Sequence, residues 1–115
     1  MKLLGLRTVI YPASDLEATK QWYIQATGVQ PYFDEPFYVG FNIGGNELGL
    51  DPDASQTTTY WGVENIEPAW EHLIGTGANA NEEIREVGGG IKVATVKDPF
   101  GNVFGIIENP HFVIQ

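Results

Sequence analysis

The sequence predicts an α+β fold in which two βαβββ modules each carry an open, curled sheet. Two observations predict it: an internal repeat, and an order of helical and extended patterns that is the same in both copies. The helical pattern that begins at Asp15 returns at Asn65, and the segment 45–50 (GNELGL) returns at 101–106 (GNVFGI). A chain of 115 residues suits one domain. We therefore predict a single domain over 1–115, with modules at about 3–51 and 57–108 and a tail at 109–115.

The first module begins with an apolar, β-branched run at Leu6–Tyr11, which is typical of a strand. Ser14 followed three residues later by Glu17 has the spacing of a capping box, so we expect a helix after Ser14 that ends at Gly28. Three short strands are predicted next, at Pro31–Phe33, Phe37–Ile43 and Glu47–Leu50.

The second module repeats this order. Thr57–Val63 is predicted to be a strand, and Asn65 is the expected N-cap of a helix with an apolar stripe from Ile66 to Ile74. Three more strands are predicted at Glu82–Val87, Ile91–Lys97 and Asn102–Ile107.

Charge limits the classes of partner. Six Lys and Arg residues against fifteen Asp and Glu residues give a net charge of −9, and no Lys or Arg lies between Gln21 and Ile84. Nucleic acid and anionic membranes are disfavoured because their binding requires cations. The chain has no Cys, which excludes disulfides and thiolate sites, and no apolar run that predicts a signal peptide or membrane helix. We expect a cytoplasmic protein and a cationic or neutral small-molecule partner.

Several motifs, taken in order, resemble one known family. They are Ser14–Glu17 leading to Trp22, Tyr23 and Gly28, then 44–48 (GGNEL), 63–67 (VENIE), Gly77-Ala78 and 98–102 (DPFGN). This order is similar to that of the vicinal oxygen chelate superfamily, which comprises glyoxalases, bleomycin resistance proteins and extradiol dioxygenases. The resemblance implies that the two modules form a cup that holds the ligand. It also implies a homodimer, for which the apolar tail segment 112–114 is a candidate contact.

The resemblance further implies where metal-dependent members place their ligands, on the first and fourth strand of each module. These positions correspond to Thr8, Gly49, Thr58 and Gly105. Glycine has no side chain, and a neutral threonine hydroxyl is a poor ligand for a divalent metal. We therefore predict no metal and no cofactor. His72 is expected on the solvated side of the second helix and His111 in the tail, where it packs or caps.

Side chains alternate along a strand, so an inward Thr8 fixes the direction of its neighbours. On the third strand we expect Phe41 and Ile43 in the core, with Tyr38, Gly40 and Asn42 facing the cup. Glu47 faces the cup as well and is the candidate general base or partner of a cation. The predicted ligand-binding residues are Thr8, Ile10, Tyr38, Asn42, Gly49, Thr58, Tyr60 and Gly105.

Three functions remain open at this point. The first is metal-free binding or sequestration of a small organic molecule, aromatic or cationic, as the resemblance to the drug-binding branch implies. The second is a lyase, isomerase or dioxygenase-like enzyme that uses Glu47 as acid or base, or a metal site that the sequence does not reveal. The third is a domain that serves only assembly or regulation.

Overall fold

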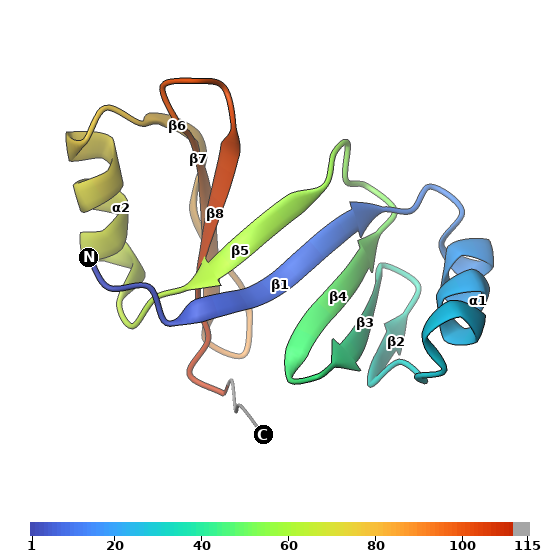
Figure 1. Cartoon of the computed structure of the whole chain (residues 1–115). Helices are drawn as coiled ribbons and strands as arrows, with labels where there is room; N and C mark the ends of the chain where they lie inside the picture. The colour runs from blue at the N-terminus through green and yellow to red at the C-terminus, as the bar shows by residue number, and fades with distance from the viewer. Residues whose placement is uncertain (112–115) are drawn as a thin grey trace. The chain divides into compact units, whose positions relative to one another are not determined.

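The computed structural model describes residues 1–111 and contains the order βαβββ twice (Figure 1). This confirms the predicted α+β fold class. The elements are β1 (Gly5–Pro12), α1 (Leu16–Thr27), β2 (Phe33–Glu35), β3 (Tyr38–Ile43), β4 (Asn46–Asp51), β5 (Thr58–Gly62), α2 (Ile66–Gly75), β6 (Asn79–Gly88), β7 (Ile91–Lys97) and β8 (Val103–Glu108).

The described residues form two compact units. The first unit is residues 8–58, and the second unit is residues 1–7 together with 59–111. The N-terminal segment belongs to the second unit, where the Leu4 N–H donates to the Gly62 carbonyl at 2.8 Å. The predicted dimer contact of Phe112, Val113 and Ile114 lies outside the described residues, and the homodimer stays a prediction.

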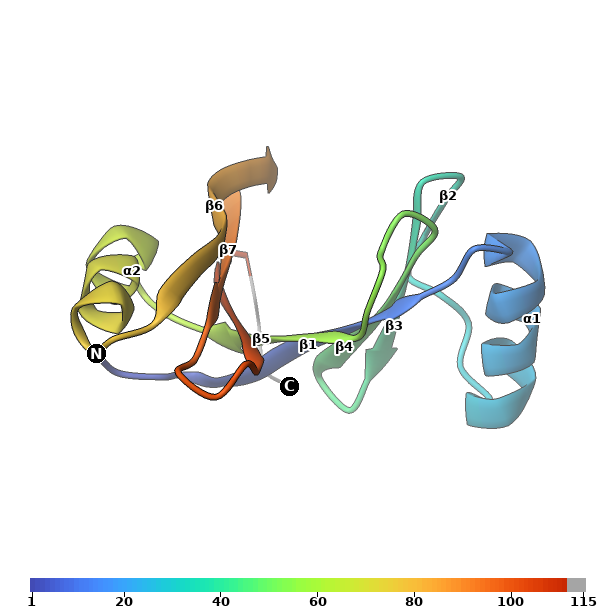
Figure 2. The same cartoon turned by 90° about the horizontal axis from the view of Figure 1, so that it is seen from above.

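The first unit is a mixed sheet with one helix. Its strand order is β2-β3-β4-β1, in which β1 and β4 run parallel and the other pairs are antiparallel. Helix α1 lies beside this sheet, as Figure 2 shows from above. The core between them consists of Ala13, Val39, Phe41 and Leu50, with Tyr11, Leu16, Tyr23, Ile24, Val29 and Leu48 packed against it. One face of the sheet is therefore covered by α1, and we call the opposite face the open face.

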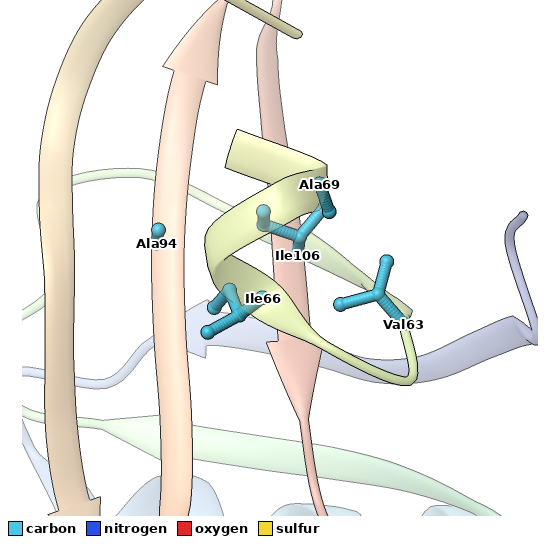
Figure 3. Close-up of a cluster of buried hydrophobic side chains, with 5 residues drawn as sticks. All are labelled: Val63, Ile66, Ala69, Ala94 and Ile106. Atoms are coloured by element: carbon cyan, nitrogen blue, oxygen red, sulfur yellow. The ribbon is translucent and has the colours of Figure 1, made fainter. Parts of the chain in front are cut away.

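The second unit repeats this arrangement with the strand order β5-β8-β7-β6 and helix α2. Its core contains Val63, Ile66, Ala69, Ala94 and Ile106, drawn in Figure 3. The Ile66 N–H at the start of α2 donates to Glu108 Oε1 at 2.9 Å, so a carboxylate from β8 caps this helix. Asn65 is the N-cap residue, as predicted, but its side chain makes no capping hydrogen bond.

Four local predictions were wrong. Strand β6 begins at Asn79, three residues earlier than expected. The N-cap of α1 is Asp15, not Ser14, because the Asp15 carboxylate accepts from the Ala18 N–H at 3.1 Å. Strand β2 begins at Phe33, two residues later than expected. Ile43 is not in the core: it stands at the hairpin end of β3 with 38% of its surface exposed, outside the cluster that packs against α1.

Within residues 1–111, no helix has the length and apolar character needed to cross a membrane.

Candidate functional site

Strand register gathers polar side chains on the open face of the first unit. Thr8 lies directly opposite Glu47, and Gly40 lies opposite Gly49. Directly opposed residues point to the same side of a sheet. Since Val39, Phe41 and Leu50 face α1, the alternate positions Tyr38, Gly40, Glu47 and Gly49 face away from it.

Glu47 is the centre of this face because three hydroxyl groups donate to its carboxylate. The Tyr38 hydroxyl donates to Oε1 at 2.8 Å, and the Thr8 hydroxyl donates to the same oxygen at 3.2 Å. The Tyr32 hydroxyl donates to Oε2. Hydrogen bonds to an ionised acceptor are stronger than neutral ones, so these three donors stabilise the negative charge and fix its position.

Two glycines, Gly40 and Gly49, leave the space that the rings of Tyr32 and Tyr38 occupy. A Cβ on Gly49 would lie 2.6 Å from Cζ of Tyr38, and a Cβ on Gly40 would lie 3.1 Å from Cε1 of Tyr32. The same Gly40 Cβ would lie 2.7 Å from Glu47 Oε2. Each of these distances is shorter than a normal van der Waals contact. The rings can therefore lie over Gly40 and Gly49 and reach Glu47 only because both positions lack a side chain.

The tyrosines of the open face are held in their neutral form. Burial, followed by the charge of Glu47, raises the pKa of Tyr38 far above its ordinary value. Burial also raises the pKa of Tyr32, and its hydrogen bond to Glu47 adds to this effect. Both hydroxyl groups therefore keep their protons, and remain donors to Glu47, at an alkaline pH at which an ordinary tyrosine has lost its own.

Because the pKa of Tyr38 is raised, the free energy of unfolding depends on pH in the alkaline range. In the unfolded chain this group loses its proton near its ordinary pKa of about 10, whereas the folded protein retains it. Its contribution is complete below about pH 10 and is lost as the pH rises further. Above pH 10 we expect the free energy of unfolding to fall by up to about 1.4 kcal/mol per pH unit on account of this group. Urea unfolding between pH 9 and 11.5 measures the slope, and Tyr38→Phe should reduce it; equal slopes in both proteins would refute the expectation.

The open face is acidic and borders an aromatic surface. Glu35 and Asp51 share it with Glu47, since they lie opposite Tyr38 and Pro12. Phe33 lies opposite Gly40, and its ring is 6.1 Å from that of Tyr38 and 6.0 Å from that of Phe37. We call Tyr32, Phe33, Phe37 and Tyr38 the aromatic wall.

The first unit has few positive charges that could neutralise its acidic open face. Lys20 is the only Lys or Arg between residues 8 and 58, where the sequence has seven Asp and Glu residues. Its ammonium group pairs with Glu17 at 2.9 Å and Asp34 at 3.1 Å. Asp34 lies opposite the core residue Val39, so this ion pair is on the α1 side of the sheet.

The structure brings together part of the predicted site. Thr8, Tyr38, Gly49 and Glu47 meet on the open face. Ile10 lies opposite Gly49 on the same face. Asn42 lies opposite Glu47, but its side-chain oxygen accepts the Gly45 N–H at 2.9 Å and so belongs to the hairpin turn.

The remaining predicted residues belong to β5 and β8, and their surroundings differ from the expected open cup. Tyr60 lies opposite Gly105, and a Cβ on Gly105 would lie 2.8 Å from Cδ1 of Tyr60 and collide with the Thr59 carbonyl oxygen. Gly105 is thus covered by its neighbouring strand. Thr58, at the start of β5, is half-buried.

Both histidines have the surroundings that the sequence predicts. His72 is exposed on α2. His111 Nε2 donates to the Gly89 carbonyl at 2.7 Å, and the backbone N–H of His111 donates to the Asn109 side chain at 2.9 Å, so His111 packs on the β6–β7 turn.

Sequence reasoning missed two contributors to the site. The sequence predicts Tyr32 inside a strand, whereas it precedes β2 and its N–H donates to the Gly40 carbonyl at 3.0 Å. For Phe33 the sequence predicts only the end of that strand. The cluster of four aromatic residues in the seven positions 32–38 is the signal that could have identified this surface.

Comparison with known proteins establishes the family. The model of the Glyoxalase/Bleomycin resistance protein/Dioxygenase superfamily matches residues 5–106. The chain belongs to this superfamily. Among curated proteins, none matches it significantly in sequence.

Several solved structures share the fold at low sequence identity. Methylmalonyl-CoA epimerase of Streptomyces coelicolor, in complex with 2-nitronate-propionyl-CoA, is 13% identical over 95% of this chain and 99% of that one, with a TM-score of 0.80. A superfamily member from Vibrio splendidus 12B01 is 18% identical over 90% and 97% of the two chains, with a TM-score of 0.68. An NAD-dependent benzaldehyde dehydrogenase from Legionella pneumophila is 14% identical over 88% and 96%, with a TM-score of 0.72. At these identities the likeness extends to the fold alone.

The metal that many glyoxalase-superfamily proteins carry does not fit the corresponding residues of this chain. Gly49 and Gly105 offer no donor atom and are covered by the rings of Tyr38 and Tyr60. Thr8 already donates its hydroxyl to Glu47. Within residues 1–111, no three His, Asp or Glu side chains are grouped so that they could hold a metal ion.

Proposed function

We propose that the open face of the first unit binds a small organic cation that carries a flat apolar group. The observation that carries this proposal is the Glu47 carboxylate, held by Thr8, Tyr32 and Tyr38. A cation gains from a fixed, partly desolvated carboxylate more than from a mobile one, since the protein has already lost the entropy of fixing it.

The aromatic wall supports the apolar part of this ligand. Phe37 is 64% exposed and Phe33 is 38% exposed, although both are large apolar side chains. Aromatic faces attract cations and stack on flat groups, by about 0.5–1 kcal/mol at exposed sites and more when water is excluded. An exposed aromatic surface beside a fixed carboxylate therefore favours cationic aromatic molecules over anionic or purely apolar ones.

Acid–base catalysis by Glu47 is the weaker alternative. A carboxylate has about four acceptor positions, and hydroxyl groups occupy three of those on Glu47. A general base must reach the proton of its substrate through a free position. Recognition of a cation, in contrast, requires the negative charge of the carboxylate and not a free acceptor position.

The test is calorimetric titration with benzyltrimethylammonium as the probe. Glu47→Gln keeps the size of the side chain and removes the charge, so we expect at least about tenfold weaker binding, which corresponds to about 1.4 kcal/mol. Glu17→Gln is the matched control, because Glu17 lies on α1 and pairs with Lys20; this variant should bind like the unaltered protein.

The titration uses protein treated with a chelator, because we propose that binding requires no divalent metal. Equal affinities of the Glu47→Gln variant and the unaltered protein would refute the proposed site. Binding that disappears with the chelator and returns with zinc would refute the metal-free part of the proposal.

A further inference from the structure

Tyr32 has an arrangement that is unusual for an exposed aromatic residue. Its side chain is 63% exposed, yet its N–H donates to the Gly40 carbonyl at 3.0 Å and its hydroxyl donates to Glu47 Oε2. The ring lies over Gly40, where no side chain obstructs it. An exposed tyrosine is thus held in one position at the outer side of the Glu47 carboxylate.

The two oxygens of Glu47 differ in their surroundings. Oε1 accepts from Thr8, which is buried, and from Tyr38, which is mostly buried. Among residues 1–111, Tyr32 is the hydrogen-bond donor to Oε2. A ligand that arrives from solvent therefore meets Oε2 first, and the hydroxyl of Tyr32 already occupies one of its acceptor positions.

Ammonium ligands differ in what they require from this oxygen. A primary ammonium carries three N–H donors, and each donor that leaves water without an acceptor costs about 1–3 kcal/mol. A quaternary ammonium has no N–H donor and needs only negative potential and aromatic faces. With Tyr32 in place, the carboxylate still supplies the potential but offers few free acceptor positions.

We propose that Tyr32 is a specificity-determining residue that makes this site prefer quaternary over primary ammonium ligands. The inference rests on the proposed function, since it concerns the ligand class of the same site. Tyr32 contributes in two ways: its hydroxyl group occupies Oε2, and its ring extends the aromatic wall.

The experiment compares benzyltrimethylammonium with benzylammonium, which share the aromatic ring and a single positive charge. We expect the unaltered protein to bind the quaternary probe about tenfold more tightly, which corresponds to the loss of about one hydrogen bond. Tyr32→Phe keeps the ring over Gly40 and frees Oε2, so it should strengthen benzylammonium binding and bring the ratio of the two dissociation constants close to one. Tyr23→Phe is the matched control: it removes a hydroxyl from the α1 side, where Tyr23 packs on the core, and should leave the ratio unchanged.

The outcomes separate this inference from the proposed function. If both probes bind, Glu47→Gln weakens both, and Tyr32→Phe leaves their ratio unaltered, the role of Tyr32 is refuted while the binding site stands. If neither probe binds, or Glu47→Gln has no effect on either, the proposed function fails and the role of Tyr32 with it. A ratio that falls in Tyr32→Phe and not in Tyr23→Phe supports the inference.

Discussion

Phe41→Ala is expected to lower the free energy of unfolding by about 3–5 kcal/mol. Phe41 has none of its surface exposed and lies on β3 in the core beneath α1. The substitution removes the apolar contacts of the ring and leaves a cavity, because Val39 and Leu50 are fixed by strand pairing and can fill it only in part. A loss of this size is a large fraction of the stability of a small domain.

Urea denaturation followed by far-ultraviolet circular dichroism measures the effect, and the chain provides a matched control. Phe100 lies in the turn before β8 with 87% of its surface exposed, so Phe100→Ala should change stability by less than about 0.5 kcal/mol. A cost below 1 kcal/mol for Phe41→Ala, or equal costs for the two variants, would contradict the core described above.

Alternation along strands explains how much of the candidate site is predictable from the sequence. Once one residue of a strand is assigned to a face, the period of two places the others of that strand: an inward Gly49 places Glu47 on the same face of β4, and Phe41 in the core places Tyr38 on the opposite face of β3. The structure agrees, since Thr8 and Tyr38 both donate to Glu47 while Phe41 is buried against α1. Which face a side chain takes is a local property of the strand.

Depth of burial is a different property, and alternation does not determine it. Ile43 has the same parity as Phe41 but stands at the end of the β3–β4 hairpin, beyond the residues that α1 covers. Its exposure depends on where the helix ends over the sheet. A sequence pattern indicates which face of the sheet a side chain occupies, but it does not indicate how much of that face the helix covers.

The partners of Glu47 could not be predicted for a related reason. Tyr32, Tyr38 and Thr8 lie 15, 9 and 39 residues from it in sequence. Their meeting depends on the register of three strand pairs and on the start of β2, which falls two residues later than its pattern indicates. The strand propensity of a short aromatic run does not distinguish a loop residue from an edge-strand residue, so Tyr32 was assigned to the wrong element.

The glycines of β4 and β8 hold an equivalent place in the repeat, but replacing them with alanine should cost different amounts of stability. Gly105→Ala is expected to cost about 3 kcal/mol, at the upper end of the range for overpacking. The new Cβ would collide with the Thr59 carbonyl oxygen and lie 2.8 Å from the Tyr60 ring. The carbonyl belongs to the backbone of β5, which pairs with β8 in parallel, so relief requires the strands to separate.

Gly49→Ala is the matched comparison, because there the added Cβ meets only the end of the Tyr38 side chain. Rotation of that side chain relieves the clash but breaks its hydrogen bond to Glu47, so we expect a loss of about 1.5 kcal/mol, the lower end of the range for a hydrogen bond to a charged group. Neither glycine has a positive φ, and without a clash the change to alanine would stabilise the chain by about 0.4–1 kcal/mol through the unfolded state. Denaturation of both variants measures the difference, and a Gly105→Ala protein as stable as Gly49→Ala would mean that β5 and β8 can accommodate a methyl group between them. The contrast follows from what each glycine faces: a side chain that can rotate in one module, and a paired strand in the other.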